Sequence, residues 1–92
     1  MLKKAGLLNV KSERREHVPG DAIHEMGGAR MGADPRTSVL NKWNQVHAGK
    51  NVFVTDGASM ASSACQNPSL TYMALTARAA DYAVRQLKGG KL

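Results

Sequence analysis

The chain has 92 residues, of which 42% are hydrophobic and 4% aromatic, and a formal net charge of +6 at pH 7. This length argues against two separate cores, the single cysteine excludes an internal disulfide, and no stretch reaches the ~18 apolar residues of a membrane span. The positive charge gathers at the two ends, while residues 17–84 hold equal numbers of basic and acidic side chains, which argues against a nucleic-acid-binding face.

The first half of the chain predicts little regular structure. Residues 1–5 have the pattern of the end of a helix, with Gly6 as its stop. Residues 7–15, LLNVKSERR, alternate loosely and could form a strand. Glycine and proline interrupt residues 17–38, which leaves room for at most a short strand around residues 22–26. Residues 38–50 are irregular, and we expect one turn there.

The clearest strand is NVFVTDG, residues 51–57, which contains consecutive β-branched and aromatic residues and ends at Asp56-Gly57. The clearest helix follows it, with Asn67 suited to the N-cap, Pro68 to the first helical position and Gly89-Gly90 to the end. One apolar stripe at helical spacing makes this helix amphipathic, and its members are Leu70, Met73, Ala74, Ala77, Ala80, Val84 and Leu87. We expect Met73 on this stripe to fill the core.

Two loops carry the residues that could take part in binding or catalysis. HEMGGARMG, residues 24–32, combines a histidine with three glycines, so its backbone can pass close to a flat ligand. DGASMASSACQNPS, residues 56–69, leads from a strand end to a helix N-terminus, where free N–H groups and the helix dipole favour an anion. Taken singly, a loop histidine is more often a surface residue, and Asn-Pro at a helix start is more often only a cap.

Two other kinds of site find no support in the sequence. His17, His24, His47 and Cys65 show no Cys-x-x-Cys or His-x-x-x-His spacing, so a zinc site is not predicted. Ser62 and Ser63 lack a nucleophile elbow, so a hydrolase triad is not predicted either.

The motifs are more specific in combination. His24-x-x-Gly27-x-x-Arg30-Met31-Gly32, Asp34-Pro35, Ser38-Val39, NVFVTDGAS and QNPSLTYMALTARAADY together resemble the C-terminal conserved region of the glucose–methanol–choline (GMC) oxidoreductases. The residues of these motifs are most similar to those of the bacterial sugar-oxidising branch, which includes glucoside 3-dehydrogenases and gluconate dehydrogenase large subunits. The resemblance implies an α/β class, here as an α+β fragment: the C-terminal piece of a two-domain FAD-binding fold, with a short strand leading through a loop to a long C-terminal helix.

The resemblance also implies a division of the chain. Residues 1–19 would be the tail of the substrate domain, residues 20–88 the GMC C-terminal region, and residues 89–92 a short tail. The Gly-x-Gly-x-x-Gly turn that holds the ADP half of FAD is absent. We therefore expect a fragment of a longer enzyme or, alternatively, a separate small subunit that completes a site on a partner. In both cases the rest of the GMC enzyme is the partner.

The activity implied by the resemblance is FAD-dependent oxidation of the CH–OH group of a small alcohol or sugar, with hydride transfer to flavin N5. The family's catalytic pair matches His24 and Asn67, whose separation is the one that the resemblance leads us to expect. His24 would accept the hydroxyl proton, because an imidazole pKa lies near working pH. Asn67 would hold the substrate oxygen through its amide.

The implied cofactor contacts lie in the second loop. Asp56 and Gly57 would approach the ribityl–pyrophosphate part of FAD, and Asn67 and the backbone of Pro68 and Ser69 would face the N1–O2 edge of the flavin. Most contacts to FAD would come from residues outside this chain, so we expect the isolated chain to bind no FAD and to be inactive. The competing hypothesis is a small non-enzymatic interaction module that packs through its amphipathic helix.

Overall fold

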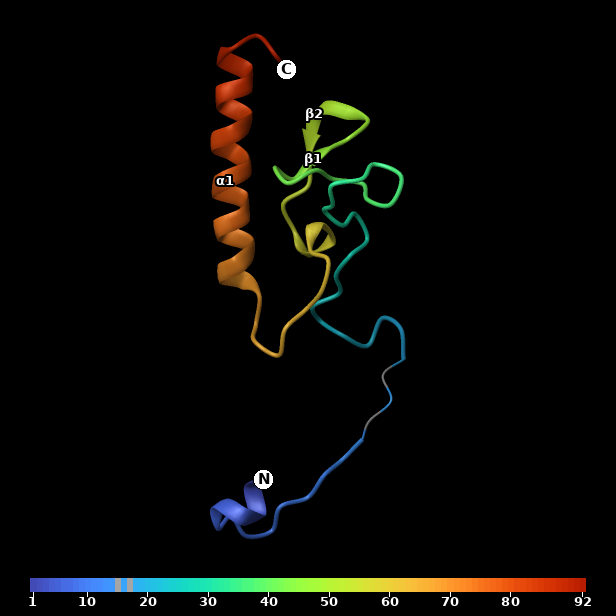
Figure 1. Cartoon of the computed structure of the whole chain (residues 1–92), viewed down its shortest axis with the longest axis vertical. Helices are drawn as coiled ribbons and strands as arrows, with labels where there is room; N and C mark the ends of the chain where they lie inside the picture. Colours follow the sequence, from blue (N-terminus) through green and yellow to red (C-terminus); the bar gives the residue numbers. More distant parts are fainter. Residues whose placement is uncertain (15, 17) are drawn as a thin grey trace.

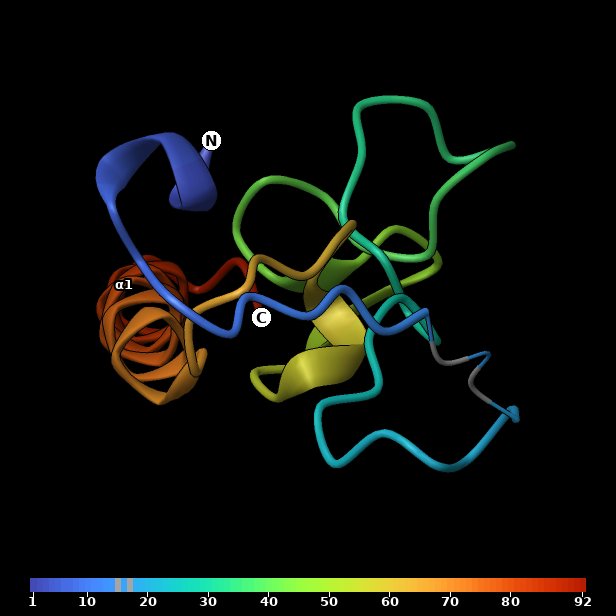
Figure 2. The same ribbon diagram turned by 90° about the horizontal axis from the view of Figure 1, so that it is seen from below.

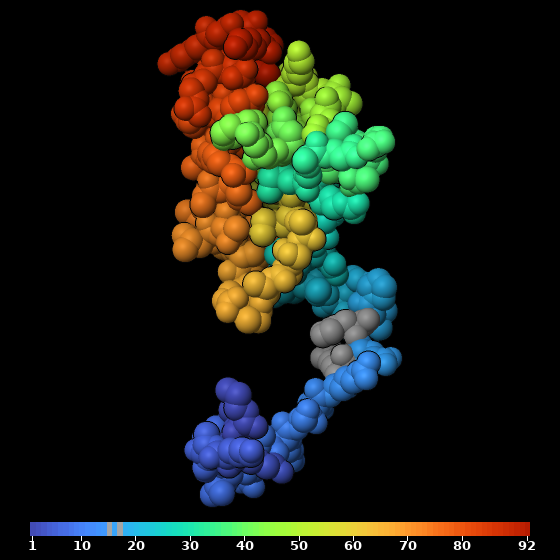
Figure 3. Space-filling view, viewed as in Figure 1, coloured from blue at the N-terminus to red at the C-terminus, as the bar shows by residue number. Residues whose placement is uncertain are grey.

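The computed structural model describes residues 1–14, 16 and 18–92. Its elements are η1 (Leu2–Ala5), β1 (Gln45–Val46), β2 (Gly49–Phe53), η2 (Gly57–Ser59) and α1 (Ser69–Lys88). Figure 1 shows α1 running along one side of a body made of loops and the small sheet, while η1 lies at the end of an extended N-terminal arm. The radius of gyration is 18.5 Å, against roughly 12 Å for a compact domain of this length. The chain is thus a small mixed strand and helix structure with an arm that stands clear of the body (Figure 3).

The ends of the helices largely follow the local sequence. The predicted helix end at residues 1–5 is confirmed as η1, and Gly6 closes it with φ 83°. The start of α1 was predicted one residue too early, because Pro68 is the N-cap and Ser69 the first helical residue. The Pro68 carbonyl accepts the Tyr72 N–H at 3.0 Å, which is the first bond of the helix. At the other end Gly89 is the C-cap, as predicted.

The sheet consists of β1 and β2 in an antiparallel pair with one irregularity in its register. The predicted strand is present but displaced, since β2 begins at Gly49 and ends at Phe53. Val54 follows the strand, and its N–H donates to the Asn44 carbonyl at 2.9 Å. The two further strands that the sequence allowed are not present, because residues 7–14 and 22–26 form none. Arg15, at the end of the first, and His17 lie outside the described residues.

The core is small and lies between α1 and the loops. Among the described residues, Leu40 and Ala79 are the buried hydrophobic side chains, with 0% and 1% exposure. Trp43 stacks on Tyr82 of α1 with ring centroids 4.8 Å apart and the planes 3° from parallel. Phe53 of β2 meets the same tyrosine edge-on at 6.3 Å. Aromatic contacts therefore attach the helix to the sheet.

The face of α1 that packs on the body is not the predicted stripe. Leu70 is 79% exposed, Met73 68% and Leu87 65%, so the expectation that Met73 fills the core is wrong for this chain. The packed face carries Tyr72, Leu75, Ala79 and Tyr82 instead. The physical reason is that α1 has two apolar stripes, and the aromatic partners Trp43 and Phe53 select the one with the tyrosines. In the described part of the chain, no helix has the length and hydrophobicity to cross a membrane.

Candidate functional site

The loop that follows His24 lies against the turn that follows β2. Backbone N–H groups of Gly27, Ala29 and Met31 donate to the carbonyls of Gly57, Ala58 and Ser59 at 3.4, 2.9 and 3.0 Å respectively. The donors are alternate residues of the loop, the acceptors are the three consecutive residues of η2, and the two segments are far apart in the sequence. These three bonds fix the histidine-bearing loop beside η2.

Gly57 is the point where the loop, the turn and the helix meet. A Cβ atom at this residue would lie 2.9 Å from the Glu25 carbonyl oxygen and 2.9 Å from the Tyr72 hydroxyl oxygen. Glu25 directly follows His24, and Tyr72 lies in the first turns of α1. The close approach requires glycine here, because any larger residue would displace one of the two neighbours.

The predicted catalytic and cofactor-binding residues differ in their exposure to solvent. His24 and Gly57 are half-buried and Pro68 is buried. Asn67, Ser69 and Asp56 are exposed. The structure brings together the segments that carry these residues, and the roles of the individual side chains stay predictions.

Asp56 also has a structural role that was not predicted from the sequence. Its side-chain oxygen Oδ1 accepts the N–H of Ala58 at 2.9 Å, which caps η2. Its carbonyl oxygen accepts the Ser59 hydroxyl at 2.9 Å, and Ser59 is fully buried. An Asp followed by Gly-Ala-Ser is a typical N-cap signal, so the sequence could have indicated this role.

Behind the turn, a polar link joins the middle of α1 to the end of β2. One Nη2 atom of Arg78 donates to the Lys42 carbonyl at 2.7 Å and to the Asn44 side-chain oxygen at 3.4 Å. The Asn44 amide donates in turn to the Val54 carbonyl at 3.0 Å. Asn44 is fully buried and has φ 61°. The link holds the chain just before Asp56. It could not be predicted from a local sequence pattern, because its partners are far apart in the sequence.

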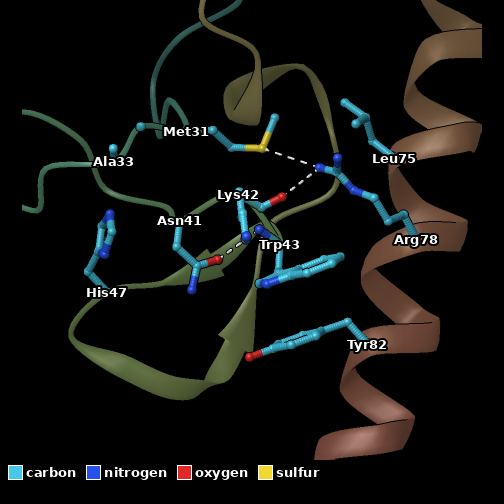
Figure 4. A pocket seen from close by; sticks show the side chains of 10 residues that line it. Met31, Ala33, Asn41, Lys42, Trp43, His47, Leu75, Arg78 and Tyr82 are labelled. Atoms are coloured by element: carbon cyan, nitrogen blue, oxygen red, sulfur yellow. Dashed lines mark hydrogen bonds between the residues drawn. The ribbon is translucent and has the colours of Figure 1, made fainter.

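A half-open hollow of about 730 Å³ lies between α1 and the loop of residues 31–47. Figure 4 shows Trp43 and Tyr82 stacked at its side, with Arg78 reaching across from α1. Its lining consists of Met31, Gly32, Ala33, Asn41, Lys42, Trp43, His47, Leu75, Arg78 and Tyr82. None of the predicted site residues lines it, so this hollow is a different place from the meeting point at Gly57.

Ser38 and His47 form a pair beside the hollow that has the composition of a nucleophile and its base. The Ser38 Oγ atom donates to the Asp34 carbonyl at 2.7 Å, and His47 Nε2 lies 3.1 Å from Ser38 Oγ. Because the Ser38 hydroxyl proton is hydrogen-bonded to the Asp34 carbonyl, His47 Nε2 donates a hydrogen bond to Ser38 Oγ and does not accept one from it. The pair is therefore a structural bridge and not an activated serine.

Asp34 and Arg36 form the clearest ion pair of the loop, with Arg36 Nη2 2.8 Å from the carboxylate. Hydrogen bonds from the side chain and the backbone N–H of Arg36 hold the pKa of Asp34 below its usual value. The same pairing raises the pKa of Arg36. Within the described residues, no group of three His, Cys, Asp or Glu side chains could hold a metal ion.

Comparison with known proteins gives a consistent result. The family model for GMC oxidoreductases matches residues 5–76. The fructose dehydrogenase large subunit of Gluconobacter japonicus is 48% identical over 67 residues, which is 73% of this chain and 12% of that protein. The 2-methyl-1,2-propanediol dehydrogenase of Mycolicibacterium austroafricanum is 44% identical over 68 residues, 74% of this chain and 12% of that protein. The cholesterol oxidase of Acinetobacter baumannii is 39% identical over 66 residues, 72% and 12% respectively.

Proposed function

The chain belongs to the GMC oxidoreductase family, and from this premise we propose that it carries part of the active site of an FAD-dependent enzyme that oxidises the CH–OH group of an alcohol or sugar. GMC oxidoreductases act on CH–OH donors and are generally flavoproteins. Two of the relatives are named as dehydrogenases of fructose and of a propanediol, which supports a hydroxyl-bearing substrate. The chain spans 12% of the length of these relatives, so the activity belongs to the chain together with the rest of such an enzyme.

The meeting of three segments at Gly57 is the observation that carries the proposal. His24 comes directly before Glu25, whose carbonyl oxygen would lie 2.9 Å from a Cβ on Gly57. Tyr72 meets the same glycine from α1, two turns or less from Asn67. These contacts support the proposal that His24 and Asn67 act as a pair on one substrate, because each is a few residues from a contact at Gly57.

His24 is proposed as the proton acceptor. It is half-buried, and a neutral imidazole nitrogen can take the proton of a substrate hydroxyl near neutral pH. Asn67 is exposed just before the buried Pro68, so its backbone is anchored while its carboxamide can hold the substrate oxygen. Because the carboxamide is neutral over this pH range, it orients the substrate without competing as a base.

The residues of the second loop fit a flavin on two observations. The turn of Asp56 and Gly57 is held by the Ala58 N–H, which donates to Asp56, and by the close packing of Gly57 against the Glu25 carbonyl and the Tyr72 hydroxyl, so its backbone is fixed in place for a cofactor. The first turn of α1 carries no acidic residue, and no side chain caps it. Its N–H groups therefore favour an anionic partner, by about 0.3–2 kcal/mol from the dipole. Asp56, Gly57, Asn67, Pro68 and Ser69 would hold FAD, which when bound would supply the hydride acceptor.

The test is a chimera, defined as the Gluconobacter japonicus fructose dehydrogenase large subunit with the stretch that this chain matches replaced by this chain. We expect the chimera to retain flavin and to oxidise a hydroxyl-bearing substrate, with an Asn67→Ala variant impaired mainly in turnover. The matched control is Asn51→Ala, an exposed asparagine at the start of the predicted strand. A chimera that binds flavin and turns over at the same rate with Asn67→Ala would contradict the role of this residue.

A further inference from the structure

Helix α1 has a second apolar stripe that no described residue of this chain covers. This outer stripe follows an alternating spacing of three and four residues and consists of Leu70, Met73, Ala77, Ala80, Val84 and Leu87. All six are exposed, with Val84 48% and Leu87 65% exposed. Figure 2 shows α1 end-on, with the sheet and most of the loops on one side of it. The outer stripe is rotated by roughly 140° from the packed face, at ~100° a residue.

A helix that packs through one face is normally polar on the rest of its surface. In α1 the charges of Arg78, Asp81 and Arg85 lie in a third sector, and Lys88 lies at the edge of the outer stripe, in line with Leu70 at 3.6 residues a turn. The Arg85 guanidinium and the Asp81 carboxylate pair along this sector at 2.6 Å. A helix that is apolar on two separated faces and charged on one narrow sector is patterned to lie between two layers. One of these layers is the body described above.

The outer stripe extends about 25 Å along the helix axis, at ~1.5 Å a residue. It begins at Leu70, directly after the predicted cofactor-binding residues Asn67, Pro68 and Ser69. Anything that covers it would therefore also fix the position of the helix N-terminus. The described residues of this chain bury only two hydrophobic side chains of their own, Leu40 and Ala79, so the chain has no surplus core to fold over the stripe.

We propose that the outer stripe is the docking face for the part of a GMC oxidoreductase that this chain does not cover, through an apolar surface on that part. The inference rests on the proposed function, because it takes the remainder of a GMC enzyme as the occupant. The size of the relatives supports this choice, since the chain accounts for 12% of each. Docking would place α1 between two layers and hold Asn67 against the flavin-binding part of the enzyme.

The first test is a binding measurement with a defined probe, the Gluconobacter japonicus fructose dehydrogenase large subunit produced without the stretch that this chain matches. We expect the 92-residue chain to bind it and Val84→Glu to weaken binding about tenfold or more. Arg85→Glu is the matched control, because it adds the same side chain at the next residue, about 100° around the helix from Val84 on the charged sector, and it should change the affinity less than about threefold. Equal affinities for the two variants would overturn the proposal, as would a stable dimer of the chain that the probe does not displace.

The second test does not depend on the truncated probe folding alone. Val84→Cys and Arg85→Cys, each in a Cys65→Ser background, are labelled with a thiol reagent in the chimera, and the modified peptides are quantified by mass spectrometry. We expect position 84 to react about tenfold more slowly than position 85 in the chimera and at a similar rate in the isolated chain. Equal rates in the chimera would overturn docking while leaving the proposed function untouched. If position 84 is protected but His24→Ala does not change the turnover of the chimera, the proposed function is contradicted and the docking proposal is not.

Discussion

Gly57 and Tyr72 approach so closely that a Cβ atom on residue 57 would lie 2.9 Å from the tyrosine hydroxyl oxygen. The two residues belong to the turn after β2 and to the first turns of α1. The Glu25 carbonyl lies equally close to the same position. This contact makes one small residue responsible for the spacing of all three segments that carry the proposed site.

Gly57→Ala is therefore expected to lower the free energy of unfolding by about 1–3 kcal/mol, because the new methyl group must displace both the Glu25 backbone and the Tyr72 hydroxyl. Urea unfolding of the chain, followed by circular dichroism, measures the change. Adding Tyr72→Phe should recover part of the loss by removing the hydroxyl. The control is Gly28→Ala, whose Cβ would make an ordinary 3.8 Å contact with Ala58. Equal stability of the two alanine variants would contradict the close approach.

Asn44 is expected to be sensitive for two separable reasons. Its amide satisfies the Val54 carbonyl, and its φ of 61° is a conformation that asparagine and glycine tolerate better than alanine. Asn44→Gly should cost about 1–3 kcal/mol from the lost hydrogen bonds, and Asn44→Ala about 1 kcal/mol more from the backbone. The two variants are compared by denaturant unfolding. An alanine variant as stable as the glycine variant would show that the backbone conformation carries no cost.

The stack of Trp43 on Tyr82 offers a direct spectroscopic report, because Trp43 is the only tryptophan. Tyr82→Phe keeps an aromatic ring at the site and should leave the emission wavelength and the stability nearly unchanged. Tyr82→Ala removes the ring, so we expect a red-shifted emission. The free energy of unfolding should fall by less than the ~3–5 kcal/mol typical of truncating a fully buried aromatic side chain, because Tyr82 is half-buried. A blue or unchanged emission in the alanine variant would place Trp43 elsewhere.

Asp34 is expected to titrate at a lower pH than an ordinary aspartate, because Arg36 stabilises its charged form. A carboxyl pKa that is lower in the folded state contributes stability above the ordinary pKa, and this contribution is lost as the pH falls through the lowered value. The effect on stability is small, because the arginine and aspartate side chains are 87% and 38% exposed. NMR titration of the Asp34 carboxyl carbon gives its midpoint. Arg36→Gln should raise that midpoint, and no change would show that the pair does not form in solution.

The local parts of the fold could be predicted from the sequence. Helix α1 ends at Gly89 and η1 ends at Gly6. Both ends are predicted by a glycine directly after the helix, so a few consecutive residues are enough to predict them. The packed face of α1 could not be predicted, because the helix has two apolar stripes and only distant aromatic partners decide between them. The strand β1 was missed for a similar reason, since it has only two residues and pairs with a displaced β2.

The candidate site shows the same division. Its two loops could be singled out by glycine content and by the helix start, and the structure brings both to Gly57. The support from Asn44 and Arg78 could not be foreseen, because neither residue has a recognisable motif and their bond joins positions far apart in the sequence. Long-range polar contacts of this kind become visible only once the chain is folded.

The rate at which substrate reduces the bound flavin in the chimera tests the role of His24 most directly. We predict that His24→Ala lowers this rate by about 10²–10⁴-fold while the flavin content stays the same. His47→Ala serves as the control, because His47 lies beside the separate hollow and contacts Ser38, and it should leave the rate within about twofold. An undiminished rate of flavin reduction in the His24→Ala chimera would contradict a proton acceptor at this position.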